Sequence, residues 1–309
     1  MRLIELEEIQ ETLDLEKAYA MQKEGFRAFA AGKLIQPPVA HLNLPEGSLH
    51  IKFGMIQGDS HFVVKQATGF SKNWKQGLRT GDGFLSVFCA QTGRLTALIL
   101  DQSYLTDLRT AFAVRIAVEK WAPPTVSSVG VLGTGTQARL AVQQQALATG
   151  CRNILVWGRH PERLRTYKDE MERDGFHVIP VETPIELLEQ SDIVLTTCSS
   201  REPLLPFSEN LRAQLIVAVG ADEAGKQELD TRLSNSAKRV IADSPEQCLQ
   251  IGELQHAHFR VEEIVPLGAA LDEPVTPVSG LTLVDLTGLA VQDIQMVNAI
   301  IFGKHRLKN

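Results

Sequence analysis

The chain has 309 residues, 44% of them hydrophobic and 22% charged, with a formal net charge of −6. This length is enough for two domains with separate cores. The sequence has no long Lys/Arg run, so it does not predict nucleic acid or an anionic membrane as a partner. No window approaches the ~20 apolar residues of a membrane span, and the acidic N-terminal segment lacks the apolar stretch of a signal peptide. We therefore expect a cytoplasmic globular protein.

The cysteine and histidine spacings predict neither disulfides nor a metal centre. Cys89, Cys151, Cys198 and Cys248 are far apart and form no CxxC motif, which is typical of reduced thiols in a cytosolic protein. The histidines in HAHF (residues 256–259) are two residues apart, but no third ligand is evident, so we expect no metal.

The first 110 residues are predicted to form a helix followed by strands. Leu15–Ala31 has helical periodicity and ends before Gly32, and the prolines of QPPVAHL exclude a helix there. Four short runs rich in β-forming or alternating residues then predict an antiparallel or mixed sheet, and a helix follows from about Thr106 to Trp121. The predicted strands are Ser48–Met55, His61–Ala67, Gly83–Cys89 and Leu95–Leu100.

From Val126 onward, short apolar strands alternate with helical segments. This alternation predicts parallel strands in a doubly wound, Rossmann-type α/β sheet, beside a smaller α+β domain. We expect residues 111–289 to be the dinucleotide-binding domain. Residues 1–110, with a C-terminal helix from about 290 to 309, would form the smaller first domain. The predicted strands are Val129–Leu132, Ile154–Trp157, His177–Val181, Ile193–Cys198, Leu215–Val219 and Arg239–Ala242; the helices between them are Thr136–Ala148, Pro161–Asp174 and Ile185–Gln190, and the segment LTGLAVQDIQMVNAIIFGKH predicts the last helix.

A glycine turn follows the first strand of this second region. Gly133 permits a tight turn, Gly135 allows a phosphate to approach the backbone, and Ala138 takes the third position of G-x-G-x-x-G/A. The N-terminus of the following helix favours an anion. Because no GK[ST] follows, we expect a dinucleotide rather than a nucleoside triphosphate. The predicted contacts are Gly133, Thr134, Gly135, Thr136, Gln137 and Ala138, with Thr197 after the fourth strand.

The end of the second strand indicates which dinucleotide binds. NAD enzymes usually place a carboxylate there, whereas this strand continues Trp157-Gly158-Arg159-His160. Arg159 is placed to meet a 2′-phosphate, with Arg163 one turn later as a second cation. Alternatively, Arg159 stacks on adenine or is simply exposed. We favour NADP(H) over NAD(H).

Three further segments carry candidate catalytic residues. Lys65 lies within an otherwise apolar strand, so it must either reach solvent or face a cleft. Arg109 and Thr110 lie near the start of the connecting helix, and Asp222 follows a parallel strand, where ligands bind in such sheets. The alternatives are a solvent-reaching Lys65, a helix-capping Arg109 and a loop-capping Asp222.

The motifs LTDLRTA, GTGTQA, VGAD followed by EL, and TGLAVQD occur in this order, and through them the chain resembles the ornithine cyclodeaminase/μ-crystallin family. The resemblance covers nearly the whole chain. It implies a two-domain subunit in which residues 1–110 and the C-terminal helix form the substrate-binding and dimerisation domain of a homodimer. The resemblance further implies a nicotinamide cofactor in the second domain and a small amino- or imino-acid substrate. It also implies that Lys65 and Arg109 contact the substrate carboxylate, that Asp222 contacts the reacting nitrogen or water, and that Thr80 and Thr110 lie near the nicotinamide.

Two positions depart from the cyclodeaminase pattern. A further arginine of ornithine cyclodeaminases is matched here by Val39, and the nearest basic residue, His41, is not at an equivalent position. Arg159 replaces the acidic residue of the NAD-using cyclodeaminases. Both departures favour a reductase that exchanges its cofactor.

Three functions therefore remain open. The first is an NAD(P)H-dependent imine or ketimine reductase, or amino-acid dehydrogenase, acting on a small α-imino or α-amino acid. In this function Lys65 and Arg109 would hold the carboxylate, and Asp222 would stabilise the protonated nitrogen. The second is ornithine cyclodeaminase, which yields proline and ammonia without net redox change. The third is a non-catalytic, crystallin-like protein that binds the cofactor.

Overall fold

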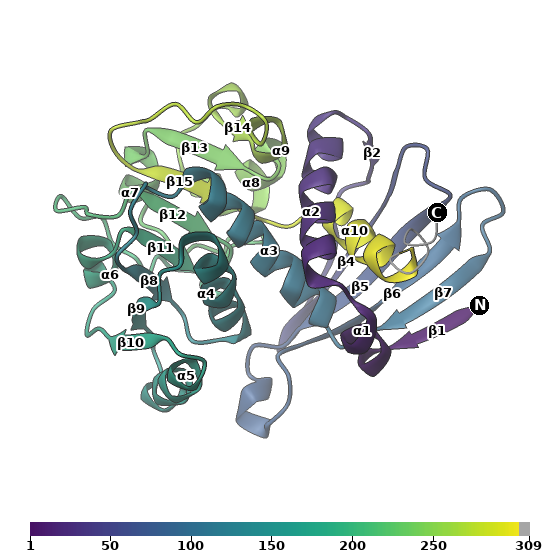
Figure 1. The fold of residues 1–309 in the computed structure, drawn as a ribbon, viewed down its shortest axis with the longest axis horizontal. Coiled ribbons are helices and arrows are strands. Elements are labelled where there is room, and N and C mark those ends of the chain that lie inside the picture. Colours follow the sequence, from purple (N-terminus) through teal and green to yellow (C-terminus); the bar gives the residue numbers. More distant parts are fainter. Residues whose placement is uncertain (303–309) are drawn as a thin grey trace. The chain divides into compact units, whose positions relative to one another are not determined.

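The computed structural model describes residues 1–302 and contains two compact units. The first unit combines Met1–Arg109 with the chain from Leu289 onward, and the second is Thr110–Gly288 (Figure 1). Within residues 1–302, no helix has the length and apolar character needed to cross a bilayer.

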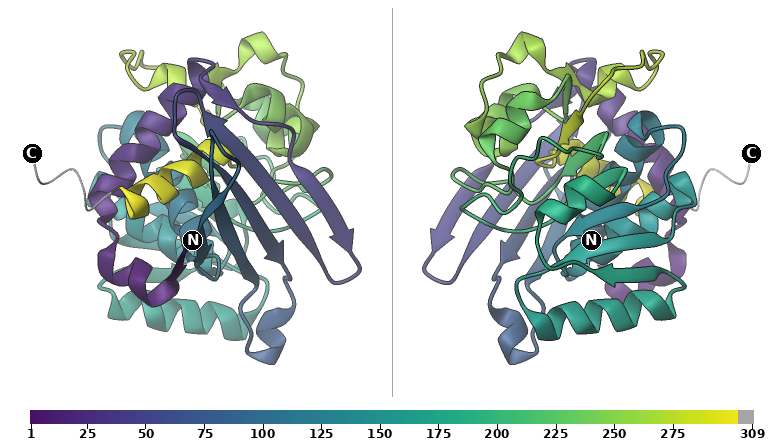
Figure 2. Two further views of the ribbon diagram at one scale, coloured as in Figure 1. Left: turned by 90° about the vertical axis from the view of Figure 1, so that its right-hand side faces the viewer. Right: turned by 90° about the vertical axis from the view of Figure 1, so that its left-hand side faces the viewer.

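The first unit is built on a seven-stranded mixed sheet with the order β1-β7-β6-β5-β4-β2, in which β3 also pairs with β4. β1 runs parallel to β7, and the other pairs are antiparallel. The β3–β4 hairpin projects at the edge of this sheet (Figure 2). The elements are β1 Arg2–Glu5, α1 Leu6–Thr12, α2 Leu15–Ala30, β2 Leu34–Ile35, β3 Ala40–Leu44, β4 Gly47–Ile56, β5 His61–Gly69, the 3₁₀ turn η1 Asn73–Gln76, β6 Gly81–Cys89, β7 Leu95–Leu100 and, after the second unit, α10 Ala290–Ile301.

The two faces of this sheet differ because side chains alternate along each strand. On the inner face, α2 and α10 lie across the strands (Figure 1), and a Cβ added at Gly54 would lie 3.6 Å from the Ala290 Cβ of α10. Val63 and Lys65 project from this face and are buried. The outer face carries apolar side chains that stay partly exposed, among them Leu3, Phe62, Val64, Phe88 and Leu98.

The second unit contains an eight-stranded, wholly parallel sheet with the order β10-β9-β8-β11-β12-β15-β13-β14. Its central strands are fully buried, as expected when helices cover both faces. The α/β class with a doubly wound parallel sheet is therefore confirmed. The strands are β8 Val129–Leu132, β9 Asn153–Trp157, β10 His177–Pro180, β11 Ile193–Thr196, β12 Leu215–Ala218, β13 Arg239–Ala242, β14 Val265–Pro266 and β15 Thr282–Asp285.

The chain reverses its winding direction at β8, which lies between β9 and β11. Loops leaving the carboxyl ends of such neighbouring strands diverge and leave a crevice for a ligand. The turn after β8 and the loop after β11 are therefore where a cofactor is expected. The helices of this unit are α3 Tyr104–Trp121, whose first turns belong to the first unit, α4 Thr136–Thr149, α5 Pro161–Arg173, α6 Ile185–Gln190, α7 Thr231–Ser236, α8 Pro245–Ile251, α9 Leu267–Ala270, and the 3₁₀ turns η2 Glu253–His256 and η3 Val261–Glu263.

The end of the chain corrects one expectation. Residues 286–289 were expected in the last helix, but α10 begins at Ala290. Gly288 has a φ of 81°, which a helix cannot continue through, and Asp243 binds the Gly288 N–H at 2.6 Å. The preceding strand β15 was not predicted, because nothing in its short run separates a strand from the approach to a helix. The expected helical residues beyond 302 lie outside the described part of the chain.

Candidate active site

The glycine turn after β8 has the backbone geometry that a phosphate needs. Gly133 has a φ of 122°, and a Cβ there would lie 2.5 Å from the Thr197 Oγ1, so only glycine fits. Gly135 is the N-cap of α4 and supplies no capping side chain. A Cβ on Gly135 comes no closer than 3.8 Å to another described atom, the Arg163 Nη2. The first N–H groups of α4 therefore point into space that an anion can enter.

The residues around this turn fix it to its neighbours. Thr134 is buried and its carbonyl accepts a 2.9 Å hydrogen bond from the Arg139 guanidinium. Ala138 is fully buried, which allows α4 to pack closely on the sheet. Thr197 donates from its hydroxyl and its N–H to the Leu132 carbonyl, both at 3.0 Å. Thr136 is exposed and Gln137 partly buried in the first turn of α4. Among the predicted cofactor residues, the structure thus brings together the glycine turn and Thr197.

Arginine side chains gather beside the glycine turn. Arg159 follows β9 and is exposed, and Arg163 lies in the first turn of α5. Burial lowers the pKa of Arg163, and the charges of Arg139 and Arg159 lower it further. Such mutual repulsion requires the three guanidinium groups to lie near one another. Arg139 is also paired with Glu170, so Arg159 and Arg163 are the candidates for contact with an anion at this end of the second unit.

Asp222 lies in the loop after β12, partly exposed, and is paired with a lysine that sequence reasoning missed. The Lys226 ammonium donates to the Asp222 Oδ1 at 2.6 Å and lies 3.6 Å from Glu223. Burial alone lowers the pKa of Lys226, but the two acids more than offset this and raise it. The ion pair places the Asp222 carboxylate next to a largely buried ammonium group in this loop.

Glu228 is a second missed residue, and it connects two strand ends of the second unit. Its Oε2 accepts from the Thr196 hydroxyl at 2.7 Å and the Gly220 N–H at 2.9 Å, while its Oε1 accepts from the Cys198 N–H. A Cβ on Gly220 would lie 2.3 Å from this carboxylate, so close approach requires glycine. Burial raises the pKa of Glu228. Glu228 therefore positions the loop after β11 against the loop that carries Asp222.

The first unit holds a buried ionic cluster at Lys65 and Arg109. Lys65 is 3% exposed, and its ammonium donates to the Asp293 Oδ1 at 2.9 Å. The Arg109 Nε lies 3.6 Å from the same oxygen, and this residue is 8% exposed. Burial lowers the pKa of Lys65, Asp293 raises it, and Arg109 lowers it again. Lys65 thus neither reaches solvent nor forms a surface ion pair, and Arg109 is not a helix cap.

The other Asp293 oxygen, Oδ2, and the Arg109 Nε have no hydrogen-bond partner within the described chain. Buried polar atoms are normally satisfied, so these two mark a place for a polar ligand or water. Gln292 orients the arginine: its amide donates to the Arg109 carbonyl at 3.2 Å, and its Oε1 lies 3.5 Å from the Arg109 Nη1.

Asp101 lies just before α3 and completes the surroundings of Lys65. Burial raises its pKa to about 6, against the lowering effects of a 2.9 Å hydrogen bond from the Leu105 N–H and the charge of Lys65. Gln102 and Ser103, which follow, have φ angles of 50° and 65°, unusual for residues other than glycine. Backbone strain of this kind persists where the surrounding structure fixes it, and here it lies at the start of the helix that carries Arg109.

Sequence reasoning missed Asp293, Gln292 and Asp101. A signal for the first was available: TGLAVQD was noted as a motif, but its aspartate was given no role. The family resemblance implies that Thr80 and Thr110 lie near the nicotinamide. Thr80 lies in the exposed loop before β6, where its carbonyl accepts from the Phe70 N–H at 2.8 Å, and Thr110 follows Arg109 in α3. Their roles stay predictions.

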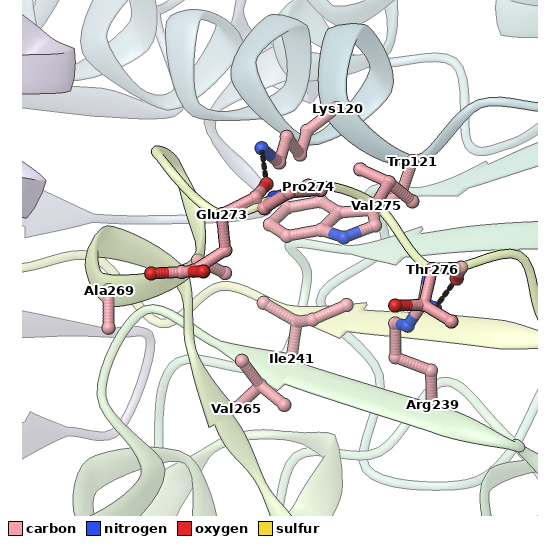
Figure 3. A pocket seen from close by; sticks show the side chains of 11 residues that line it. Lys120, Trp121, Arg239, Ile241, Val265, Ala269, Glu273, Pro274, Val275 and Thr276 are labelled. Atoms are coloured by element: carbon pink, nitrogen blue, oxygen red, sulfur yellow. Dashed lines mark hydrogen bonds between the residues drawn. The ribbon is translucent and has the colours of Figure 1, made fainter.

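A separate cavity of about 250 Å³ lies in the second unit, between the end of α3, strands β13 and β14, and residues 269–276. Figure 3 shows the Trp121 indole and Ile241 at its centre. Lys120 donates to the Leu271 and Glu273 carbonyls at 2.8 and 2.6 Å, which ties the 271–276 segment in place. None of the predicted site residues lines this cavity.

Several known proteins are similar to this chain over most of its length. The chain is 31% identical over 293 residues to an uncharacterized cyclodeaminase of Sinorhizobium fredii, covering 91% of this chain and 88% of that protein. It is 28% identical over 316 residues to the iminosuccinate reductase of Paracoccus denitrificans, covering 99% and 98%. The structure of that reductase in complex with NAD⁺ superposes with a TM-score of 0.84 at 27% identity, covering 98% and 95%.

A lysine cyclodeaminase structure superposes with a TM-score of 0.87 at 25% identity, covering 98% of this chain and 92% of that one. Finally, the sequence model of the ornithine cyclodeaminase/mu-crystallin family matches residues 2–305, nearly the full length. The chain therefore belongs to the ornithine cyclodeaminase/mu-crystallin family.

Proposed function

We propose that this protein is an NAD(P)H-dependent oxidoreductase that reduces the C=N bond of a small α-imino acid, or oxidises the corresponding α-amino acid. The observation that carries the proposal is the buried Lys65–Arg109–Asp293 cluster, in which two cations share one aspartate oxygen. Asp293 offsets only one of the two buried positive charges, and a substrate carboxylate is the anion that fits the other. The imine and amine chemistry of the relatives supports this choice.

The residues of the first unit bind and orient the substrate. Lys65 and Arg109 hold the carboxylate and thereby fix the face that the neighbouring imine carbon presents. Asp293 keeps the Lys65 ammonium in place through its 2.9 Å bond. Asp222, which is paired with Lys226, stabilises the protonated nitrogen and handles its proton. Orientation of this kind contributes several kcal/mol of barrier lowering, up to about 7–11.

The second unit is the dinucleotide-binding domain in this proposal. The open N–H groups of α4, the glycines at 133 and 135, and the cationic side chains beside them fit a pyrophosphate and a further phosphate. A bound nicotinamide supplies or accepts the hydride. Arg159 and Arg163 favour NADP(H), because two guanidinium groups suit a 2′-phosphate better than a ribose hydroxyl.

The outer face of the first sheet supports a homodimer as the assembled form. Phe62 and Phe88 stack on this face with ring centroids 5.0 Å apart and planes 8° from parallel. Val64 and Leu98 flank them, and Leu3 is 49% exposed. An apolar sheet face of this extent is normally covered, and an equivalent face of a second copy is complementary to it.

The proposal is tested by following reduced nicotinamide absorbance with purified protein. We expect oxidation of NADPH when a 2-oxo acid and ammonia or methylamine, or a cyclic imino acid, are supplied. Lys65→Met and Asp293→Asn should each lower kcat/KM at least about 100-fold, since the first removes a cation that binds the carboxylate and the second leaves two buried cations without their aspartate. Cofactor affinity, measured by fluorescence, should change less than about threefold, because neither residue belongs to the second unit.

Two other results would redirect the proposal. Formation of proline and ammonia from ornithine without a net absorbance change identifies a cyclodeaminase. Cofactor binding without turnover across the panel identifies a crystallin-like binding protein. Wild-type rates from both variants would remove the active-site assignment.

A further inference from the structure

A second lysine lies beside Lys65 on the inner face of the first sheet. In the antiparallel ladder of β4 and β5, Lys52 is paired directly with Lys65, so the two side chains project from the same face. This is the face that meets α10, because Gly54, two residues further along β4, approaches Ala290. Lys52 is only 6% exposed. β4 therefore places a second buried lysine one strand away from the first.

Lys52 is a positive centre distinct from the pair that would hold the α-carboxylate. Lys65 and Arg109 converge on one oxygen of Asp293, at 2.9 and 3.6 Å. Besides burial, the charges that most affect the Lys65 pKa are those of Asp293, Arg109 and Asp101. The Lys52 backbone is offset from that of Lys65 by one strand spacing, about 4.8 Å. Two long side chains that start one strand apart on the same face can reach the two carboxyl groups of one short diacid.

The composition of β4 shows that its inner side is polar over several residues. His50 shares the face of Lys52, with its Nε2 2.8 Å from the Ser48 Oγ and its ring 4.6 Å from the His41 ring. The residues that alternate with them, Ile51 and Phe53, are apolar. An ordinary core-facing strand reverses this pattern, with its polar side chains toward solvent. The basic inner side of β4 is what a site for an anionic group requires.

We infer that Lys52 binds a second carboxylate at the far end of the substrate, which makes the preferred substrate a short α-imino dicarboxylic acid. This inference rests on the proposed function and names its substrate class. In the reaction, the imine carbon accepts a hydride from the reduced nicotinamide and the nitrogen takes a proton, giving an α-amino dicarboxylic acid and the oxidised cofactor. Lys52 selects the substrate and takes no part in the hydride transfer.

The first test compares two acceptors with the intact enzyme: oxaloacetate plus methylamine and pyruvate plus methylamine. We expect wild-type kcat/KM to be at least about tenfold higher for the diacid imine. Lys52→Met, which keeps the length but removes the charge, should reduce this ratio at least about tenfold, and Lys52→Arg should retain most of it. Lys72→Met, at an exposed lysine of the same unit, should leave the ratio unchanged.

The ratio separates recognition from folding, because a structural role for Lys52 lowers both activities together and leaves the ratio as it was. An unchanged ratio in Lys52→Met, or a wild-type preference for the pyruvate imine, overturns the inference while leaving the proposed reductase intact.

A second measurement works without turnover. Titration calorimetry of the enzyme saturated with NADP⁺ should show succinate binding at least about tenfold more tightly than propionate, with the difference lost in Lys52→Met. Equal affinities in the wild type overturn the inference. Succinate selectivity that depends on Lys52, together with no turnover of any acceptor, shows instead that the anion site exists and the proposed reaction does not.

Discussion

At the scale of single residues, the proposals about the substrate depend on two buried lysines on neighbouring strands. Lys65 interrupts an apolar run and was singled out for that reason, whereas Lys52 interrupts the similar run LHIKFGM and was not. The same signal applies to both, since a lysine within a half-buried strand needs an anion or solvent. The partner of Lys65 could not be predicted from the neighbouring sequence, because Asp293 is 228 residues away in the chain.

Asp101 makes stability depend on pH in a definite direction. Burial raises its pKa from the ordinary 3.8 to about 6, so the folded chain binds its proton more tightly than the unfolded chain. The stability that this proton contributes is fully present below about pH 3.8 and is lost as the pH rises through about 6. Between about pH 4.5 and about pH 7, we expect wild type to lose about 2 kcal/mol relative to Asp101→Asn.

Urea unfolding of both proteins at the two pH values measures this difference. Asp82→Asn, at an exposed aspartate of the same unit, serves as the control and should track the wild type. A wild-type loss no larger than that of Asp101→Asn would show that the carboxyl titrates near its ordinary value.

At the scale of elements, the turn after β8 and the start of α5 are the best-determined parts of the site. The strand, the two glycines and the helix are adjacent in the chain, so local pattern alone predicted them. α4 runs from Thr136 to Thr149, and Gly150, with a φ of 73°, caps its C-terminal end. By contrast, Glu228 accepts hydrogen bonds at the ends of β11 and β12, and these strand ends are neighbours only in the folded sheet.

Arg159→Asp should change cofactor preference at this element. The substitution removes one guanidinium from the cationic region and introduces a charge that repels a 2′-phosphate but can accept from a ribose hydroxyl. We expect the Kd for NADPH to rise at least about tenfold and that for NADH to change less than about threefold, measured by nicotinamide fluorescence. Arg165 is exposed in α5, two residues after Arg163, and Arg165→Asp should change neither Kd. An equal effect on both cofactors would place the 2′-phosphate contact elsewhere.

At the scale of the whole molecule, the proposed dimer explains why the outer face of the first sheet is apolar. A charge inserted at the stacked Phe62–Phe88 pair would be buried against a second copy without a partner. Phe62→Glu should therefore yield monomers at micromolar concentration in sedimentation velocity, where wild type sediments as a dimer. Leu147→Glu, at an exposed leucine of the second unit, should sediment like the wild type. A wild-type monomer with this face exposed contradicts the proposed assembly.

The sequence by itself determined what depends on neighbours in the chain. Alternating strands and helices, the glycine turn and a lysine in an apolar strand are local patterns, and the fold class and family that they predicted are confirmed. It also placed Lys65, Arg109 and Asp222 as candidates, whose catalytic roles stay predictions.

Only the tertiary structure decided which of these groups meet. Asp293 reaches Lys65 because α10 returns to the first sheet, and Glu228 connects β11 to β12 because those strands are neighbours. Lys52 stands beside Lys65 because of the strand register, which no local pattern fixes. The physical reason is the same in all three cases. Desolvation and ion pairing depend on distances in space, and these distances are set only when the chain folds.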